Sequence, residues 1–173
     1  KYLLGRGIVE GFGIGAEIGT NDVAARGNLC TLNEDGNILD RRANRIPSNQ
    51  AIEIINLLNR IKIDNVSITV LPVIDYRFVL VINGPGLSSN ISETDPQLTG
   101  IPIAKSLAKD EGASFTASVV NEFTDKANNI LKKRNLGANG VLLRGFSGVP
   151  TLPSFCESYS LNAGAIASYP MYQ

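Results

Sequence analysis

Histidine is absent from this chain of 173 residues. Imidazole is the side chain that proteins use most often as a general base and as a metal ligand. Without it, the chain cannot build a Ser-His or Cys-His nucleophile arrangement from its own residues. We therefore expect no self-contained hydrolytic chemistry, no catalytic residue and no metal site within the chain.

An excess of one charge is also lacking, because 16 Lys and Arg residues balance 16 Asp and Glu residues. No overall field draws such a chain to nucleic acid or to a membrane surface, so any anion site must be local. The longest apolar runs, "VSITVLPVI" and "FVLVI", are far shorter than the roughly 20 residues of a bilayer span. No basic-then-apolar leader opens the sequence. We expect a cytoplasmic protein with neither nucleic-acid nor membrane partners.

Cysteine is scarce: Cys30 and Cys156 are far apart and lack CxxC spacing. This favours two reduced thiols in the core over a disulfide or a metal site.

The length predicts one domain, residues 1–173, with a core of its own.

Two hairpins are predicted from the pattern of apolar and turn residues. Residues 22–32 form the first strand, and Asp35-Gly36 supplies the tight turn into a second strand at 38–42. Residues 66–70 alternate between apolar and polar, which indicates a half-buried strand. Residues 78–82 are all apolar and predict a covered central strand.

Two long amphipathic helices are predicted as well. Ser48 is expected to cap the first, which runs to Ile61, and Ser114 to cap the second, which ends before Gly137. Shorter elements are expected at 6–15 (helix), 140–146 (strand), 153–159 (helix) and 163–169 (strand), with a long irregular segment at 83–112. This order suits an α/β or α+β sandwich in which a mixed, largely antiparallel sheet is covered by the two long helices.

Arginine and lysine are distributed differently along the chain. The lysines lie mainly on predicted helices, whereas arginines lie in or beside predicted strands: Arg26, Arg41, Arg42, Arg45, Arg77 and Arg144. The planar guanidinium group binds a phosphate or carboxylate through two parallel hydrogen bonds. Arginines that converge at a sheet edge would therefore bind a small, multiply charged anion. The alternative is that they only form ion pairs with Asp40, Asp75, Asp95 and the glutamates.

Two local patterns refine this hypothesis. If residues 38–42 are extended, Asp40 and Arg42 point to one face and Arg41 to the other, so Arg41 is the arginine expected to reach a ligand. The segment "GPGLSSNISETDP" at 84–96 offers hydroxyl groups and backbone amides, and it is either a glycine-rich anion loop or a plain surface loop.

Several motifs resemble the archaeal-type, cofactor-independent phosphoglycerate mutases of the alkaline phosphatase superfamily: "GRGIVEGFGIGAEI", "DGNILDRRANRI", "SETDP" and "GVLLRGFSGVPTLPSF". In that superfamily a phosphatase-like domain carries a serine nucleophile and two divalent metals, such as Mn, Mg or Zn. A second domain is inserted into it and closes over the substrate. The resemblance implies that residues 1–173 are the inserted domain, inactive by itself, with the phosphatase-like domain as its partner.

The resemblance also implies a reaction, the interconversion of 3-phosphoglycerate and 2-phosphoglycerate in glycolysis and gluconeogenesis. It implies that Arg41, Arg42, Arg77 and Arg144 hold the carboxylate and phosphate groups, while Asn90 and Asp95 orient the free hydroxyl group. Two alternatives remain open at this point. One is a related phosphotransfer enzyme, such as a homoserine-kinase-like relative, and the other is a stand-alone anion-binding module.

Overall fold

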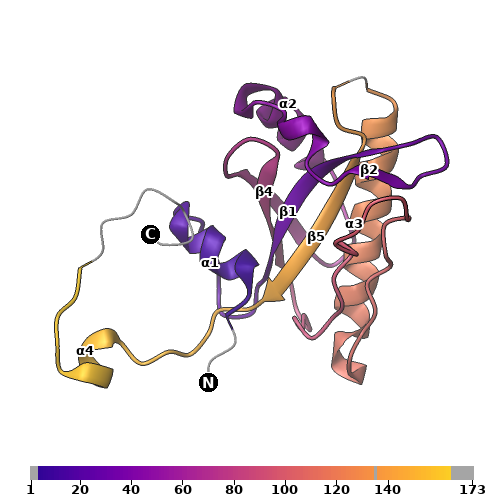
Figure 1. The fold of residues 1–173 in the computed structure, drawn as a ribbon. Helices are drawn as coiled ribbons and strands as arrows, with labels where there is room; N and C mark the ends of the chain where they lie inside the picture. Colours follow the sequence, from indigo (N-terminus) through magenta and orange to yellow (C-terminus); the bar gives the residue numbers. More distant parts are fainter. Residues whose placement is uncertain (1–3, 135, 165–173) are drawn as a thin grey trace.

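The computed structural model describes residues 4–134 and 136–164 and contains an antiparallel sheet with helices on both faces (Figure 1). In chain order the elements are α1 (Arg6–Gly13), β1 (Val23–Leu32), β2 (Ile38–Asp40), the 3-10 helix η1 (Ala43–Arg45), α2 (Ser48–Leu58), β3 (Ser67–Pro72), β4 (Arg77–Asn83), the 3-10 helix η2 (Glu111–Ala113), α3 (Ser114–Lys132), β5 (Gly140–Ser147) and α4 (Phe155–Tyr159).

Strand β1 is the centre of the sheet. It pairs with β4 on one side and β5 on the other, while β2 pairs with its last residues and β3 lies outside β4. Every pairing between these strands is antiparallel. The predicted α+β class with a largely antiparallel sheet is therefore confirmed, and the described residues contribute 5 strands to the sheet.

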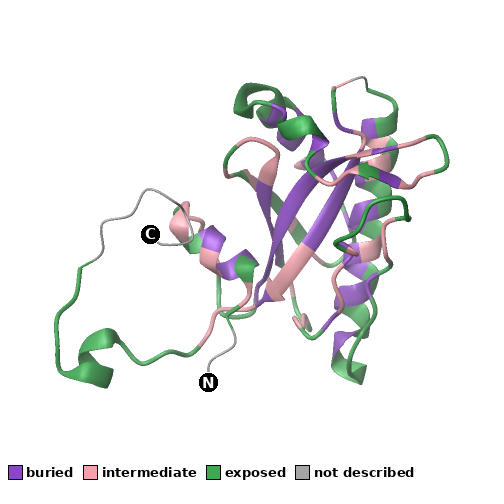
Figure 2. Cartoon of the chain, viewed as in Figure 1, coloured by how far each residue is buried: buried purple, intermediate pink, exposed green. Residues whose placement is uncertain are grey.

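Helices α2 and α3 cover one face of the sheet, and the main core lies between them and the strands (Figures 1 and 2). Side chains alternate between the faces of a strand, so every second residue of β1, β4 and β5 enters this core. The strand residues of the core are Ala25, Leu29, Val70, Phe78, Leu80, Ile82, Val141 and Leu143. As predicted, β4 is covered throughout Phe78–Ile82 and β3 is only half-buried.

The opposite face of the sheet carries the other alternating set, which includes Arg26, Asn28, Arg77 and Arg144. Helix α1 packs against this face, on β1 and β5 above all. In Figure 1 it lies to the left of the sheet, and α3 lies to the right. The face that receives α1 is thus the one on which polar side chains gather.

Several predicted boundaries were wrong. Helix α2 ends at Leu58, not Ile61, and its N-cap is Pro47 in an extended conformation, so Ser48 is the first helical residue. Its hydroxyl oxygen instead accepts a hydrogen bond from the backbone N–H of Asp75 at 3.0 Å. Ser114 is not a cap either, because η2 leads directly into α3.

The C-terminal part contains the predicted short helix, α4. It begins with a capping box, in which Ser154 and Glu157 each bind the backbone of the other. The predicted strand at 163–169 lies outside the described residues from residue 165 onward, and residues 163 and 164 are not in a strand. The thiol of Cys30 is buried as expected, but Cys156 is exposed, so its assignment to the core was wrong. Among the described helices, none combines the length and apolar character needed to cross a bilayer.

Candidate anion-binding site

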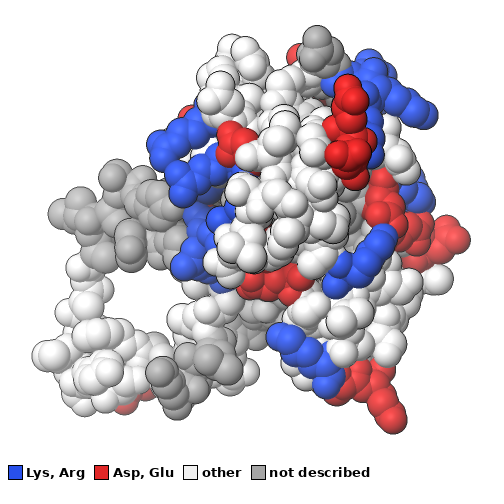
Figure 3. Space-filling view, turned by 45° about the vertical axis from the view of Figure 1, so that its right-hand side comes forward, with Lys and Arg blue, Asp and Glu red and all other residues white. Residues whose placement is uncertain are grey.

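A cavity of about 390 Å³ opens on the face of the sheet that carries the polar residues. Its lining includes all six arginines that the sequence singles out. The described residues that line it are Arg26, Asn28, Arg41, Arg42, Arg45, Asp75, Tyr76, Arg77 and Arg144. Figure 3 shows basic side chains gathered at the left of the molecule beside an acidic group, whereas basic and acidic groups mingle elsewhere on that face. The convergence of the arginines is a property of this fold.

The sheet register places four polar side chains at the floor of the cavity. Arg26 of β1 is the direct partner of Arg144 in β5, and Asn28 of β1 is the direct partner of Arg77 in β4. Like charges directly opposite each other destabilise a sheet. The Arg26–Arg144 pair therefore needs negative charge nearby, either from the protein or from a ligand.

Burial lowers the pKa of the Arg144 guanidinium, and the positive charges of Arg6 and Arg26 lower it further. Asp95 acts in the opposite direction. Two buried carboxylates, Asp95 and Glu10, offset part of this repulsion.

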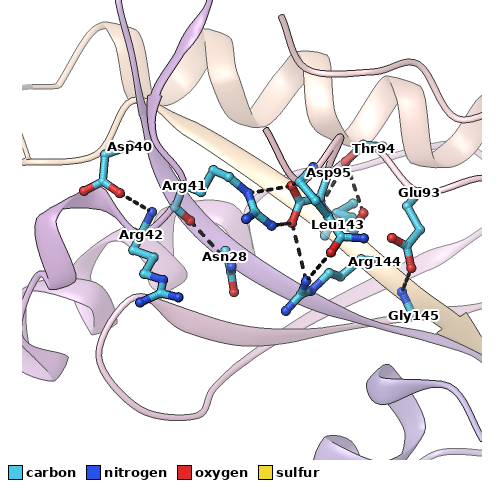
Figure 4. A network of polar contacts seen from close by, with 11 residues as sticks. Asn28, Asp40, Arg41, Arg42, Glu93, Thr94, Asp95, Leu143, Arg144 and Gly145 are labelled. Carbon is cyan, nitrogen blue, oxygen red and sulfur yellow. Dashed lines mark hydrogen bonds and ion pairs between the residues drawn. The ribbon is translucent and has the colours of Figure 1, made fainter. Parts of the chain in front are cut away.

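Asp95 binds the arginines on the β5 side. Its carboxylate accepts hydrogen bonds from Nε of Arg41 at 3.0 Å and from a terminal guanidinium nitrogen at 2.7 Å, and Arg144 lies 3.9 Å away (Figure 4). The hydrogen bond to Asp95 is the main cause that raises the pKa of Arg41. Thr94 anchors this segment, because its backbone N–H donates to the Leu143 carbonyl group at 2.9 Å and its hydroxyl oxygen accepts from the Leu143 N–H at 2.8 Å.

Glu10 of α1 binds the arginines on the β4 side. Its side chain is fully buried, and Oε1 lies 2.6 Å from Arg26 and 3.5 Å from Arg77. Helix α1 therefore contributes one carboxylate that contacts guanidinium groups from two strands. Truncating one member of such a buried network leaves uncompensated charge, which is costly.

A bulge in β5 lies next to Arg144. The register between β1 and β5 shifts between Ala24 and Arg26, opposite Gly145, which has a positive φ of 65°. A Cβ atom at Gly145 would lie 2.8 Å from the backbone nitrogen of Arg6, so glycine is required there. Bulges of this kind redirect a neighbouring side chain at the edge of a site, and here the neighbour is Arg144.

Residues 41–45 form a turn whose last three residues are left-handed. Ala43, Asn44 and Arg45 all have φ between 44° and 52°, a region that non-glycine residues rarely occupy. Asp40 stabilises this turn by accepting hydrogen bonds from the backbone N–H groups of Arg42 and Asn44. Since β2 ends at Asp40, the strand alternation that we applied to Arg41 and Arg42 was wrong, and Arg41 contacts Asp95.

Arg42 and Arg45 differ from the other arginines of the cavity. Both are exposed, and within the described part of the chain neither has a carboxylate at ion-pair distance. The alternative hypothesis of arginine–carboxylate pairing thus applies to Arg26, Arg41, Arg77 and Arg144. Among the described residues it leaves the guanidinium groups of Arg42 and Arg45 at the rim without such a partner.

Asp95 and Asn90, which were predicted to orient the hydroxyl group of the substrate, are not among the described residues that line the cavity. Asp95 is behind Arg41, where it holds the guanidinium group. Asn90 donates to the Asp110 carboxylate on the surface and is not among the residues that line the cavity. No part of the segment 83–92 lines the cavity.

Sequence reasoning missed Asn28, Tyr76 and Glu10. Asn28 lies two residues after Arg26 in a predicted strand, so alternation alone places it on the same face. Glu10 gave no such signal, because its contact depends on how α1 packs on the sheet.

Within residues 4–134 and 136–164, no three Cys, Asp or Glu side chains are grouped closely enough to hold a metal ion, so the described residues do not fit a metal centre.

Residues 1–136 match the family model described as 2,3-bisphosphoglycerate-independent phosphoglycerate mutase. The chain belongs to this family. A probable mutase of this type from Thermotoga neapolitana is 44% identical over 176 residues, and one from Thermus thermophilus is 38% identical over 175 residues. Both alignments include the whole of this chain.

A solved structure of a cofactor-independent phosphoglycerate mutase from Thermoplasma acidophilum superimposes on 98% of this chain with a TM-score of 0.79 and 32% sequence identity. The chain corresponds to 48% of that structure and to 43% of the length of each of the two mutases above. It thus spans less than half of these relatives.

Proposed function

We propose that the chain is the substrate-closing domain of a phosphoglycerate mutase and that its arginine-lined cavity binds the carboxylate and phosphate groups of phosphoglycerate. In this proposal the serine nucleophile and two divalent metals belong to a phosphatase-like domain outside residues 1–173. The intact enzyme interconverts 3-phosphoglycerate and 2-phosphoglycerate in the cytoplasm. Isolated, this chain binds substrate but has no turnover.

The observation that carries the proposal is the charge of the cavity. Among the described residues, six arginines face three carboxylates, those of Asp75 in the lining and of Asp95 and Glu10 behind it, which leaves an excess of three positive charges. Phosphoglycerate carries about three negative charges at neutral pH, one on the carboxylate and about two on the phosphate. Ligand and cavity are therefore complementary in charge.

The arginines that are fixed by carboxylates and those that are exposed have different roles in this proposal. Arg41 and Arg26 are fixed by buried carboxylates, so little side-chain freedom is lost when an anion binds. Arg42 and Arg45 lie at the exposed rim, where they can close on the anion after it enters. Phosphoryl transfer depends mainly on positioning the substrate and on neutralising its charge. These arginines can contribute to both.

Titration calorimetry of the 173-residue chain tests the proposal. The ligands are 3-phosphoglycerate, glycerate and inorganic phosphate. We expect 3-phosphoglycerate to bind at least about 10-fold more tightly than either smaller anion, since each charged hydrogen bond contributes about 1.5–3 kcal/mol. Equal affinity for 3-phosphoglycerate and inorganic phosphate would show that the cavity does not recognise the whole substrate.

A second measurement tests the division of labour between domains. With Mn²⁺ and 3-phosphoglycerate, the chain alone is expected to form no 2-phosphoglycerate, while the longer protein that contains it does. Turnover by the chain alone would place the reacting groups in residues 1–173 and contradict the proposal.

A further inference from the structure

We propose that Asn28 determines the specificity of the cavity for anions that carry a free hydroxyl group. In this proposal the side-chain carbonyl oxygen of Asn28 accepts a hydrogen bond from the hydroxyl group of the phosphorylated hydroxy acid. The inference rests on the proposed function above and adds to it a residue that the sequence motifs did not indicate.

Asn28 occupies the floor of the cavity and is only 7% exposed. Its side-chain nitrogen donates to the backbone carbonyl group of Arg41 at 3.5 Å, while its side-chain oxygen is buried and has no hydrogen-bond partner within the described residues. In Figure 4 that oxygen points away from the Arg41 carbonyl group. A buried acceptor without a partner is costly in a folded protein.

The orientation of the amide follows from its neighbours. Turned the other way, the amide would direct its oxygen at the carbonyl oxygen of Arg41 and would lose the hydrogen bond that its nitrogen donates there. Two carbonyl oxygens are both acceptors and cannot hydrogen-bond to each other. The observed orientation is therefore the favourable one, and it leaves the carbonyl oxygen for a ligand.

A hydroxyl group needs such an acceptor when it enters this site. Carboxylate and phosphate oxygens are matched by the arginines, but the hydroxyl proton has no partner among guanidinium groups. The Asp75 carboxylate can accept, but its negative charge repels a trianion. Among the described lining residues, Tyr76 is the other one with a neutral polar side chain, and its hydroxyl group both donates and accepts.

The residues that the family resemblance assigns to the hydroxyl group are engaged elsewhere. Both carboxylate oxygens of Asp95 already accept hydrogen bonds from Arg41, and one also accepts from the backbone N–H of Gln97 at 2.9 Å. Asn90 binds Asp110 outside the cavity lining. Among the described lining residues, Asn28 is the neutral one that is buried, and its side-chain carbonyl oxygen can only accept a hydrogen bond.

Calorimetry with two ligands tests the inference. The probes are 3-phosphoglycerate and 3-phosphooxypropionate, which has the same carboxylate and phosphate groups but hydrogen in place of the hydroxyl group. For the wild-type chain we expect 3-phosphoglycerate to bind about 3- to 10-fold more tightly, the range that one neutral hydrogen bond provides. In Asn28→Ala this ratio is expected to fall to about 1, with the affinity for 3-phosphooxypropionate changed by less than about 2-fold.

Two further variants separate the possible outcomes. Tyr76→Phe, the matched control, is expected to keep the wild-type ratio. Asn28→Asp keeps an acceptor and adds a negative charge. It is therefore expected to weaken the binding of both ligands while 3-phosphoglycerate still binds more tightly than 3-phosphooxypropionate. A partial folding defect in Asn28→Ala would weaken the binding of both ligands by the same factor, so the ratio of the two affinities reports on the folded chain alone.

The inference is overturned if Asn28→Ala keeps the preference or if Tyr76→Phe abolishes it. If the wild-type chain binds both ligands equally, the role of Asn28 is wrong while the proposed function stands. If it binds neither ligand, both the proposed function and the role of Asn28 fail.

Discussion

Arg41 and Asp95 form a two-point ion pair between segments 54 positions apart in the sequence. The Asp95 side chain is fully buried, whereas that of Arg41 is 25% exposed. The pair connects the left-handed turn after β2 to the segment that is hydrogen-bonded to β5. It therefore fixes one wall of the cavity before any anion arrives, and such preorganisation lowers the entropic cost of binding.

Asp95→Asn keeps the shape of this side chain but removes its charge. Breaking a buried pair from one side costs about 3–5 kcal/mol, and we expect a value near the lower limit because water screens part of Arg41. Urea unfolding measures the loss of stability. As a control, the double variant Arg41→Met with Asp95→Asn is expected to lose less than the sum of the single losses, because the unpaired charge is then removed. Additive losses would show that the two residues do not act as a pair.

Much of the sheet could be predicted from local sequence. Asp35-Gly36 specified the first hairpin, and the continuous apolar run 78–82 specified the central position of β4. The gathering of Arg26, Arg77 and Arg144 followed from their positions in predicted strands, whereas Arg41, Arg42 and Arg45 reach the cavity from the turn after β2. These features depend on periodicity and turn chemistry, both of which are visible in a short stretch of sequence.

The parts that could not be predicted depend on tertiary packing. Strand alternation failed at Arg41 because the chain leaves the sheet after Asp40 and enters a strained turn. Glu10 could not be assigned to the site, since nothing local shows that α1 packs on the polar face of the sheet. Asn28 was within reach of the alternation rule, but its unpartnered oxygen becomes visible only when its neighbours are in place.

Arg42 at the rim provides a prediction that separates binding from stability. Because it is exposed and pairs with no described carboxylate, Arg42→Ala is expected to change the free energy of unfolding by less than about 0.5 kcal/mol. It is expected to weaken 3-phosphoglycerate binding by about 1.5–3 kcal/mol through the loss of a charged hydrogen bond. Calorimetry and urea unfolding measure the two effects separately.

Arg60→Ala is the matched control, because Arg60 is also an exposed arginine but does not line the cavity. It is expected to alter neither quantity. If Arg42→Ala instead destabilises the fold and leaves the affinity unchanged, Arg42 is a structural residue and its proposed contact with the substrate is wrong.

Gly27 of β1 provides a test of the core beneath the site. It is the direct partner of Phe78 in β4, and a Cβ atom at Gly27 would lie 2.1 Å from the Phe78 ring. Gly27→Ala therefore overpacks the core and is expected to cost at least about 1–3 kcal/mol. Thermal unfolding measures this loss. The double variant Gly27→Ala with Phe78→Leu should recover part of it, because leucine leaves more room over β1.

Gly112 provides the control for this substitution, since it is exposed and the nearest atom to an added Cβ is a side-chain oxygen of Asp110 at 3.6 Å. Gly112→Ala is expected to leave the midpoint of thermal unfolding nearly unchanged. Equal effects of the two substitutions would contradict the argument that Phe78 fills the space above Gly27.

The two cysteines are expected to react differently with a thiol reagent. Cys156 is exposed and Cys30 is buried, so the native chain should show one rapidly reacting thiol, and a second only after unfolding. Measurement of thiol release with an aromatic disulfide reagent distinguishes the two. Cys156→Ser is expected to remove the rapid reaction, whereas rapid modification of two thiols in the native wild-type chain would place Cys30 at the surface.

Burial raises the pKa of the Cys30 thiol, and the negative charges of Asp95 and Asp40 raise it further. The unfolded chain ionises this thiol near its ordinary pKa of about 8.5, while the folded chain keeps it neutral. Above that pH the unfolded state therefore binds fewer protons than the native state, and stability falls as the pH rises. Between pH 8 and pH 9.5 the free energy of unfolding is expected to fall by about 1 kcal/mol more in the wild-type chain than in Cys30→Ala. Identical pH slopes for the two proteins would mean that the thiol ionises equally well in the folded and unfolded states, and they would contradict the argument from its burial.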